Sequence, residues 1–346
     1  MELNKMLKPH KRAEVEWHEI REIGQEGKNS TTYVVEDVQL GAEIVMKRIA
    51  KAKLDSAAEY FDEAKALYAT AHQNVVPVLY SCEDDEYVYI ALPFYEGGSL
   101  GSLMASRNLT VREIVRISCQ LLSGLHNIHS KGLIHFDIKP DNILLSERGE
   151  ALISDFGLAK QMYAGEAWQD QFYMPIAPPE RVVGPPFNLQ HDIYQFGLTL
   201  YRMCCGEASV REQFDAFGGD RKAFVGALEK GTYPSRSLFP EHIPNRLKSV
   251  VIQCLKPDPN DRFLSALAVA NELAKVDSCF DWMYEAVGDE KHWKRHDNGT
   301  VKSFTVRGDG STEFLTTKNG RSRRKTAHCK ATMTPTKIRG VLKSEG

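Results

Sequence analysis

The sequence predicts an α+β protein of two lobes, because its first quarter is rich in strand-like residues and the body that follows is helical. The 346 residues are 42% hydrophobic and 26% charged, which is ordinary for a chain that buries a core. We expect a β-rich lobe over residues 1–95, a helical lobe over 96–287 and a basic C-terminal extension over 288–346.

The first lobe is expected to form a sheet with one helix. Short runs rich in β-branched and aromatic residues predict five strands. They cover residues 17–23, 32–38, 43–49, 75–82 and 87–92. Residues 56–71 are rich in Ala, Glu and Leu, with apolar side chains at helical spacing, so they predict a helix. The segment 93–98 then joins the two lobes.

The second lobe is predicted to contain six helices, from segments in which apolar residues recur at helical spacing. They cover residues 100–106, 111–131, 192–203, 221–228, 244–255 and 264–275. Three short strand-like runs, at residues 133–134, 143–145 and 152–153, lie between the second and third of these helices. They flank the polar motifs described below, so the motifs are expected on turns between strands.

The extension differs from the rest of the chain in charge. Residues 291–346 hold 14 Lys and Arg against 4 Asp and Glu, a net charge of +10, whereas residues 1–290 carry −12. This asymmetry predicts a basic module on an acidic body. An acidic protein or a nucleic acid is a candidate partner of residues 291–346, and a solvated surface or docking module is the alternative.

Turn dipeptides divide the extension. Asn298-Gly299, Asp309-Gly310 and Asn319-Gly320 tolerate the positive φ angles of tight hairpins, and strand-like residues lie between them. Their spacing predicts a small β-meander. A disordered basic tail is the alternative, because Arg321–Lys325 is too charged to contribute to a core.

The sequence also argues against several classes of protein. There is no apolar run of the roughly 18 residues that a membrane span needs, and lysines near the N-terminus are not followed by the apolar core of a secretory signal. Seven cysteines form no CxxC pair, so we expect reduced thiols and no zinc site. These observations predict a cytoplasmic protein with no membrane segment.

Two motifs carry the chemistry: His135–Asn142, which reads HFDIKPDN, and Asp155–Gly157, which reads DFG. Together they supply two carboxylates, a lysine and an amide, the groups that phosphoryl transfer from Mg-ATP requires. In this interpretation Asp137 accepts the substrate proton and Lys139 lies against the γ-phosphate. Asn142 and Asp155 are the expected ligands of Mg²⁺, with Mn²⁺ as an alternative metal.

With these motifs, residues 17–276 resemble the protein kinase family. The segment Ile44–Lys47 is similar to the VAxK strand, in which the lysine holds the α- and β-phosphates. Pro178–Glu180 stands at the Ala-Pro-Glu triplet, Asp192 matches the aspartate that anchors the catalytic loop, and Arg262 is the expected partner of Glu180. The resemblance implies the bilobal kinase fold.

The resemblance also implies a nucleotide site. Glu63 is the expected partner of Lys47, with Glu59 as a second choice one turn earlier. The backbone groups of Pro93 and Tyr95 would receive adenine, and Val45 and Leu144 would cover its two faces. Gly24 and Gly27 would approach the phosphates. The glycine-rich loop departs from the family pattern, because Glu26 and Asn29 occupy expected glycine positions, so nucleotide affinity is expected to be weakened but present.

A second departure concerns regulation. Phe136 replaces the arginine that pairs with a phosphorylated activation-loop residue in the family, and residues 156–180 contain no Ser or Thr. Tyr163 and Tyr173 are the hydroxyl carriers there. We therefore expect activity that does not depend on Ser/Thr phosphorylation of this segment.

The sequence thus predicts a serine/threonine protein kinase that binds ATP and Mg²⁺ and acts on protein substrates. Lys139 favours the serine/threonine type in the resemblance. A pseudokinase-like scaffold or binding module is the alternative, supported by the altered glycine loop. A small-molecule kinase is disfavoured by Lys139 and by the pair Glu180–Arg262.

Overall fold

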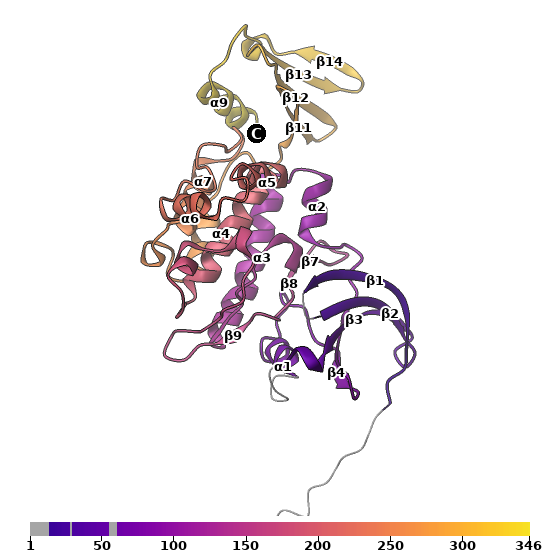
Figure 1. Ribbon diagram of the computed structural model, residues 1–346. Coiled ribbons are helices and arrows are strands. Elements are labelled where there is room, and N and C mark those ends of the chain that lie inside the picture. Colours follow the sequence, from indigo (N-terminus) through magenta and orange to yellow (C-terminus); the bar gives the residue numbers. More distant parts are fainter. Residues whose placement is uncertain (1–13, 28–29, 55–60) are drawn as a thin grey trace, which may run out of the picture. The chain divides into compact units, whose positions relative to one another are not determined.

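The computed structural model describes residues 14–27, 30–54 and 61–346, without the side chains of 24–27 (Figure 1). The chain divides into two compact units, each described by itself. The first is Met1–Tyr68 with Val76–Phe94, and the second is Ala69–Val75 with Tyr95–Gly346. The α+β class is confirmed, since the first unit is built on a sheet and most of the second is helical.

The first unit is a five-stranded antiparallel sheet in the order β1-β2-β3-β5-β4. Buried Val35, Ile44 and Met46 pack on one face of it. Its elements are β1 (Trp17–Gly27), β2 (Ser30–Asp37), β3 (Ala42–Ala50), the 3₁₀ turn η2 (Lys51–Lys53), α1 (Asp62–Ala69), β4 (Tyr80–Glu83) and β5 (Tyr87–Pro93).

The helix expected over 56–71 is present as α1, although residues 55–60 lie outside the described residues. The strand expected over 75–82 is wrong at its start, because only Tyr80–Glu83 pairs with β5. Val75 instead makes a single parallel bridge to Ile153, within the second unit.

The second unit is organised around α3, whose apolar side chains from Val111 to Ile128 are buried along one face. Thr110 and Glu113 form a capping box that fixes where the helix begins. The helices are α2 (Leu100–Ser106), α3 (Val111–Ser130), α4 (Gln190–Cys205), α5 (Glu207–Asp215), α6 (Arg221–Glu229), α7 (Asn245–Cys254), α8 (Ala266–Leu273) and α9 (Pro335–Glu345). All six predicted helices are present, and α5 and α9 were not predicted.

Short elements carry the polar motifs between α3 and α4. Antiparallel β7 and β8 follow the HFDIKPDN motif, and β6 pairs with β9. Their bounds are β6 (Leu133–Ile134), η4 (Pro140–Asn142), β7 (Ile143–Leu145), β8 (Ala151–Ile153), β9 (Lys160–Gln161), η5 (Met174–Ile176), η6 (Pro179–Val182) and η7 (Pro259–Asp261). The predicted turn location of the motifs is therefore confirmed.

The C-terminal extension is an antiparallel sheet with strands in chain order (Figure 1). The predicted meander is confirmed, and the disordered tail is the wrong alternative. The sheet holds more strands than expected: β10 (Met283–Val287), β11 (Glu290–Asp297), β12 (Thr300–Val306), β13 (Thr312–Lys318) and β14 (Arg321–Arg324), followed by η8 (Thr326–His328). Asn298 and Asn319 adopt positive φ in their turns, as the Asn-Gly pairs predict.

Helix α9 closes the core of this sheet. Ile338, Val341 and Leu342, at helical spacing, pack against aromatic residues of the strands. Trp293, Phe304 and Phe314 stack across neighbouring strands β11, β12 and β13, with ring centroids 5.8 and 5.7 Å apart. Trp282 Nε1 donates a hydrogen bond of 2.9 Å to the Leu342 carbonyl. These contacts account for an ordered module in spite of its high charge.

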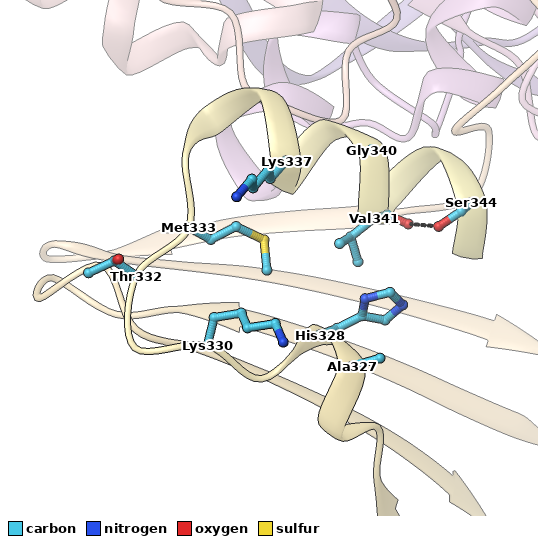
Figure 2. Close-up of a pocket in the computed structure, with 9 residues that line it drawn as sticks. All are labelled: Ala327, His328, Lys330, Thr332, Met333, Lys337, Gly340, Val341 and Ser344. Carbon is cyan, nitrogen blue, oxygen red and sulfur yellow. Dashed lines mark hydrogen bonds between the residues drawn. The ribbon is translucent and has the colours of Figure 1, made fainter.

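A pocket of about 470 Å³ lies between α9 and the segment 327–333 (Figure 2). Its lining combines apolar Met333 and Val341 with basic side chains. The basic residues are His328, Lys330 and Lys337. Neither lysine has an ion-pair partner among the residues that the structure describes.

The C-terminal sheet is joined to the helical body of the second unit by polar contacts, one of them between buried side chains. Trp293 Nε1 donates to His242 Nδ1 at 3.1 Å, and Lys291 pairs with Glu241 at 2.6 Å. Burial lowers the pKa of His242 to about 3, so its imidazole is neutral and accepts the indole proton. Arg112 of α3 also pairs with Asp281 at 2.6 Å.

Among the described residues, no helix is both long and apolar enough to cross a membrane. Each of the seven cysteines is a free thiol. No cluster of His, Cys, Asp and Glu in the described part of the chain could hold a metal by itself.

Glu345 predicts how this sheet responds to acid. Partial burial would raise the pKa of Glu345, but hydrogen bonds from Lys325, His328 and Lys302 lower it to about 2. The folded state therefore binds this proton less readily than the unfolded state, and the stabilisation is present above pH 4.5 and lost as the pH falls toward 2. We expect Glu345→Gln to lower the free energy of unfolding at pH 7 by about 1 kcal/mol after allowing for solvent screening.

Urea denaturation at pH 7 and pH 3 measures this effect. The difference between the native protein and Glu345→Gln should shrink at pH 3. Glu285→Gln, at an exposed carboxylate of β10, is the matched control and should change little at either pH. An equal loss for both variants would contradict the prediction.

Candidate active site

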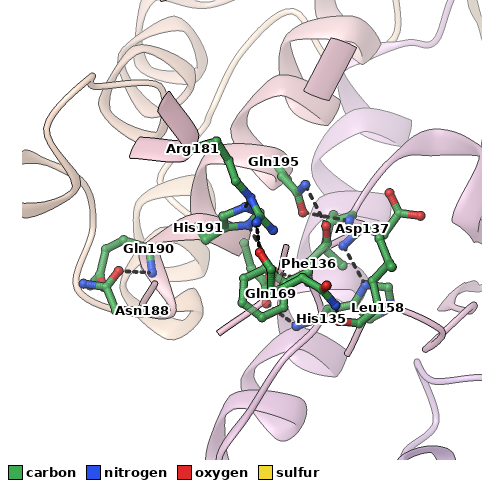
Figure 3. Close-up of polar contacts among 12 residues, drawn as sticks. His135, Phe136, Asp137, Leu158, Gln169, Arg181, Asn188, Gln190, His191 and Gln195 are labelled. Atoms are coloured by element: carbon green, nitrogen blue, oxygen red, sulfur yellow. Dashed lines mark hydrogen bonds and ion pairs between the residues drawn. The ribbon is translucent and has the colours of Figure 1, made fainter. Parts of the chain in front are cut away.

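The turn that holds Asp137 is fixed from helix α4. Asp192 Oδ2 accepts a hydrogen bond from the His135 amide, and Oδ1 accepts one from the Phe136 amide, both at 2.9 Å. Figure 3 shows His135 and Phe136 in this site. Phe136 has φ of +67°, a left-handed conformation that is unfavourable for a bulky side chain and needs such support. The anchoring predicted for Asp192 is confirmed.

The surroundings of Asp192 stabilise its ionised form. Burial would raise the pKa of Asp192, but the hydrogen bond with His129 and the neighbouring imidazoles outweigh it, so the pKa lies below its ordinary value. His129 Nε2 is 2.9 Å from Oδ2. A charged, fully buried carboxylate thus serves as the fixed point of the loop.

Gln195, one turn further along α4, supports the same loop from its other side. Its Nε2 donates to the Phe136 carbonyl at 2.9 Å, and its Oε1 accepts the Ile138 amide at 3.0 Å (Figure 3). The sequence analysis missed Gln195. Its position three residues after Asp192, on the same face of one helix, is the signal that could have found it.

Asp137 is oriented by two side chains of its own motif. Its Oδ2 accepts a hydrogen bond from Asn142 Nδ2 at 2.7 Å and lies 3.1 Å from Lys139 Nζ. Its Oδ1 is buried and has no hydrogen-bond partner among the described residues. One carboxylate oxygen is therefore held in place while the other is left as an acceptor, which is the arrangement a general base requires.

The two motifs are joined through Ser154. His135 Nε2 bonds the Ser154 carbonyl at 3.1 Å, and Ser154 donates through both its amide and its hydroxyl to the Asn142 carbonyl, at 2.9 and 3.0 Å. Burial lowers the pKa of His135, so it is neutral and Nε2 carries the proton that Ser154 accepts. Asp155, next in the chain with φ of +59°, thus follows a residue that is bonded twice to Asn142.

These residues fit a divalent cation. Asn142 uses its Nδ2 protons on Asp137, which leaves its amide oxygen as the group for a metal. Asn142 and Asp155 would supply an amide oxygen and a carboxylate, which are hard oxygen ligands of the kind that Mg²⁺ prefers.

The first unit contains the predicted ion pair. Lys47 on β3 and Glu63 on α1 are 2.7 Å apart, with side chains 12% and 9% exposed. Glu59, the second choice, lies outside the described residues. A pair this short and sheltered holds the lysine ammonium in one place.

The residues predicted to bind the nucleotide fall in both units. Buried Val45 pairs with Leu92, and Pro93 ends β5. In the first turn of the sheet, Gly24 pairs with Thr32 and Gly27 with Ser30, while Asn29 and the side chain of Glu26 lie outside the described residues.

Tyr95 and Leu144 belong to the second unit. The Tyr95 carbonyl accepts the Gly98 amide at 3.1 Å, and Leu144 pairs with Leu152 between β7 and β8. Each group is placed within its own unit, so the adenine site stays a prediction.

The pair predicted between Glu180 and Arg262 is confirmed. The guanidinium binds both carboxylate oxygens, at 2.7 and 2.6 Å, and it also donates to the carbonyls of Gln190 and Pro257. This buried arginine therefore connects Glu180, which follows the DFG motif in the chain, to the start of α4 and to the segment before η7.

The model of the protein kinase domain matches residues 17–273, about three quarters of the chain. This chain belongs to the protein kinase family. The membership explains why the two motifs, the Lys47–Glu63 pair and the Asp192 anchor occur together.

Bacterial serine/threonine kinases are similar to it. The chain is 28% identical over 220 residues to the probable serine/threonine-protein kinase CPE1738 of Clostridium perfringens, covering 62% of this chain and 31% of that protein. It is 27% identical over 320 residues to PknD of Chlamydia caviae, covering 80% and 33%, and 28% identical over 286 residues to PknD of Chlamydia trachomatis, covering 71% and 30%. The chain spans about a third of the length of these relatives.

Proposed function

We propose that this kinase transfers the γ-phosphoryl group of Mg-ATP to Ser or Thr hydroxyls of proteins. The observation that carries the proposal is the arrangement around Asp137: one oxygen is held by Asn142 and Lys139, and the other is buried without a partner among the described residues. The relatives named as serine/threonine kinases support the substrate class.

In the proposed reaction, Asp137 Oδ1 accepts the proton of the substrate hydroxyl while that oxygen forms a bond to the γ-phosphorus. The bond between the γ-phosphorus and its bridging oxygen breaks, and ADP leaves. Lys139, 3.1 Å from Asp137, lies where it can balance charge on the transferred group. Mg²⁺ at Asn142 and Asp155 supplies charge neutralisation of the phosphates.

The test is incubation of the protein with Mg-ATP and a panel of proteins, followed by mapping of phosphorylated sites. Phosphate on Ser and Thr with the native protein, and none with Asp137→Ala, is the expected result. ATP binding without transfer to any substrate would favour the alternative of a pseudokinase-like scaffold. Transfer confined to small molecules would favour a small-molecule kinase.

We further propose that activity is independent of Ser/Thr phosphorylation in residues 156–180. The segment contains no Ser or Thr, and Phe136 cannot bind a phosphate. Phosphatase-treated protein should retain its rate, and Tyr163→Phe and Tyr173→Phe should be active. Strict dependence of the rate on a phosphate carried by either tyrosine would contradict the proposal.

The ion pair of the first unit gives a separate prediction. Lys47 is proposed to hold the α- and β-phosphates, and Glu63 to position it. Glu63→Gln should lower kcat/KM for ATP about tenfold, because the ammonium loses a charge-assisted hydrogen bond. Lys65→Gln, an exposed change on the same helix, is the control and should have little effect. Equal rates for Glu63→Gln and the native protein would remove Glu63 from the proposed site.

We also propose that the basic sheet binds an acidic protein partner. Lys330 and Lys337 line the pocket beside α9, and all four residues of β14 are exposed. A nucleic acid is less suited, because Trp293, Phe304 and Phe314 are buried and no longer available for base stacking.

Retention on a poly-glutamate column and on a DNA column at rising salt tests this proposal. The double variant Lys330→Gln/Lys337→Gln should elute from poly-glutamate at lower salt than the native protein. Lys222→Gln/Lys230→Gln, outside the C-terminal sheet, is the charge-matched control. Tighter retention on DNA than on poly-glutamate would favour the nucleic-acid alternative.

A further inference from the structure

Arg181, the residue after Glu180, lies in an aromatic cage. It is 9% exposed, and its guanidinium carbon is 4.2 Å from the ring centre of Phe187 and 5.2 Å from those of Phe136 and Phe172. Phe136 and Phe187 also meet each other edge to face, with centroids 6.0 Å apart. Cation–π contacts are strongest where water is excluded, as it is at Phe136 and Phe187, whereas Phe172 is 38% exposed.

Hydrogen bonds fix the guanidinium within the cage (Figure 3). Arg181 Nε donates to His191 Nε2 at 3.0 Å, and Nη1 donates to the Gln169 carbonyl. Burial lowers the pKa of His191 to about 3, so its ring is neutral and accepts the proton. Burial also lowers the pKa of Arg181 to about 10, which leaves the guanidinium charged at neutral pH.

No carboxylate is bound to Arg181 among the described residues. Glu180 beside it is occupied by Arg262, and Arg181 Nη2 has no hydrogen-bond partner in the described part of the chain. The charge is therefore held by direct contact with ring faces, a neutral imidazole and a backbone carbonyl, while the carboxylates of Glu180, Asp170 and Asp192 favour it only through space. This is an unusual way to bury an arginine, and it argues that the residue has a specific role.

The cage connects the two segments that must be aligned for transfer. Gln169 lies in the segment 155–180, here called the activation segment, and its Nε2 donates to the Leu158 carbonyl at 2.8 Å, just after the DFG motif. Phe136, one of the rings of the cage, is the residue before Asp137, and its amide is bound by Asp192. Arg181 thus links the middle of the activation segment to the catalytic turn.

We propose that Arg181 is a positioning residue that holds the activation segment on the catalytic turn through the cage of Phe136, Phe172 and Phe187. In this role Arg181 does the work of the phosphorylated residue and of the arginine that binds it in the family. Phe136, which stands in place of that arginine, forms part of the cage. The inference rests on the proposed kinase activity and deepens its regulation.

Hydrogen exchange and steady-state kinetics of the full chain test the proposal. Arg181→Met keeps the length of the side chain and removes its charge and donors. We expect exchange of residues 158–176 to rise about tenfold, with α3 and the C-terminal sheet unchanged. We expect kcat/KM for a protein substrate to fall at least about tenfold, with KM for ATP within about a factor of two. Arg202→Met, which breaks the Arg202–Glu207 pair elsewhere on the helical unit, is the control and should leave the exchange of residues 158–176 as in the native protein.

Milder variants keep the test decisive if Arg181→Met does not fold. Arg181→Lys retains the charge but not the fork of donors, so it should restore only part of the exchange protection. Phe136→Leu removes one wall of the cage, and the double variant Phe136→Leu/Arg181→Met should lose no more protection than Arg181→Met alone, since both changes break one unit.

Several results would overturn the proposal. Native exchange rates in residues 158–176 of folded Arg181→Met, or additive losses in the double variant, would show that the cage does not hold the segment. Uniformly faster exchange throughout the helical unit would show a general stabilising role instead. Hydrogen exchange does not depend on catalysis. If the native protein has no transferase activity, the proposed function is refuted, and the exchange of Arg181→Met still tests the role of the cage.

Discussion

Asp137→Asn is expected to lower kcat for phosphoryl transfer by about 10²–10⁴, the contribution of a general base. The amide that replaces the carboxylate has one acceptor oxygen. If that oxygen remains on Asn142 and Lys139, the group left facing the substrate is an NH₂, which cannot take a proton. If the amide is rotated by half a turn, its NH₂ faces the donors of Asn142 and Lys139, and neither can bond to it.

ATP affinity and thermal stability distinguish this loss from unfolding. Both should stay near native values, because the substitution changes few atoms and Asn is nearly the same size as Asp. Asp141→Asn makes the same chemical change four residues along, at an exposed position, and should retain most of the activity. Near-native kcat in Asp137→Asn would rule out the role proposed for Asp137.

Asp192→Asn is expected to destabilise the protein by about 3–5 kcal/mol, the range for breaking a buried charged network. The carboxylate accepts the His135 and Phe136 amides on different oxygens and contacts His129 as well. An asparagine has one acceptor oxygen, so at least one buried amide loses its partner. Phe136 then loses a hydrogen bond that stabilises its positive φ, a conformation that is unfavourable for this side chain.

The midpoint and slope of urea unfolding measure this loss, and transfer activity at low temperature shows whether the catalytic turn survives in the folded fraction. Asp220→Asn is the matched control, because Asp220 caps α6 through the Ala223 amide and asparagine caps a helix equally well. It should change the free energy of unfolding by less than about 0.5 kcal/mol. A similarly small change in Asp192→Asn would show that the catalytic turn is held by other contacts.

The motif residues could be predicted from the sequence because their spacing along the chain is short and their chemistry interlocks. Asp137, Lys139 and Asn142 lie within six residues, and the turn between them leaves few ways to arrange the side chains. The pairs Lys47–Glu63 and Glu180–Arg262 followed from the family resemblance and were found at 2.7 and 2.6 Å. Both pairs could be predicted although their partners lie far apart in the chain, because the family resemblance identified each partner.

Other features gave weaker signals. Helix α5 buries only Val210, so it shows no apolar stripe by which to recognise it. Helix α9 carries a stripe at Ile338, Val341 and Leu342 and has Pro335 in its first turn, which was a usable signal. Arg181 could not have been predicted, because the three rings of its cage, Phe136, Phe172 and Phe187, come from separate segments of the chain.

The attachment of the C-terminal sheet has a practical consequence for anyone who prepares a catalytic fragment. A fragment cut at residue 273, where the family match ends, would lose Trp293 and Lys291. It would then expose to solvent the neutral imidazole of His242 and the carboxylate of Glu241, which the intact protein keeps 1% and 6% exposed, together with the apolar surface around them. Poor yield or aggregation of such a fragment would reflect where it was cut and not any fault in the catalytic machinery.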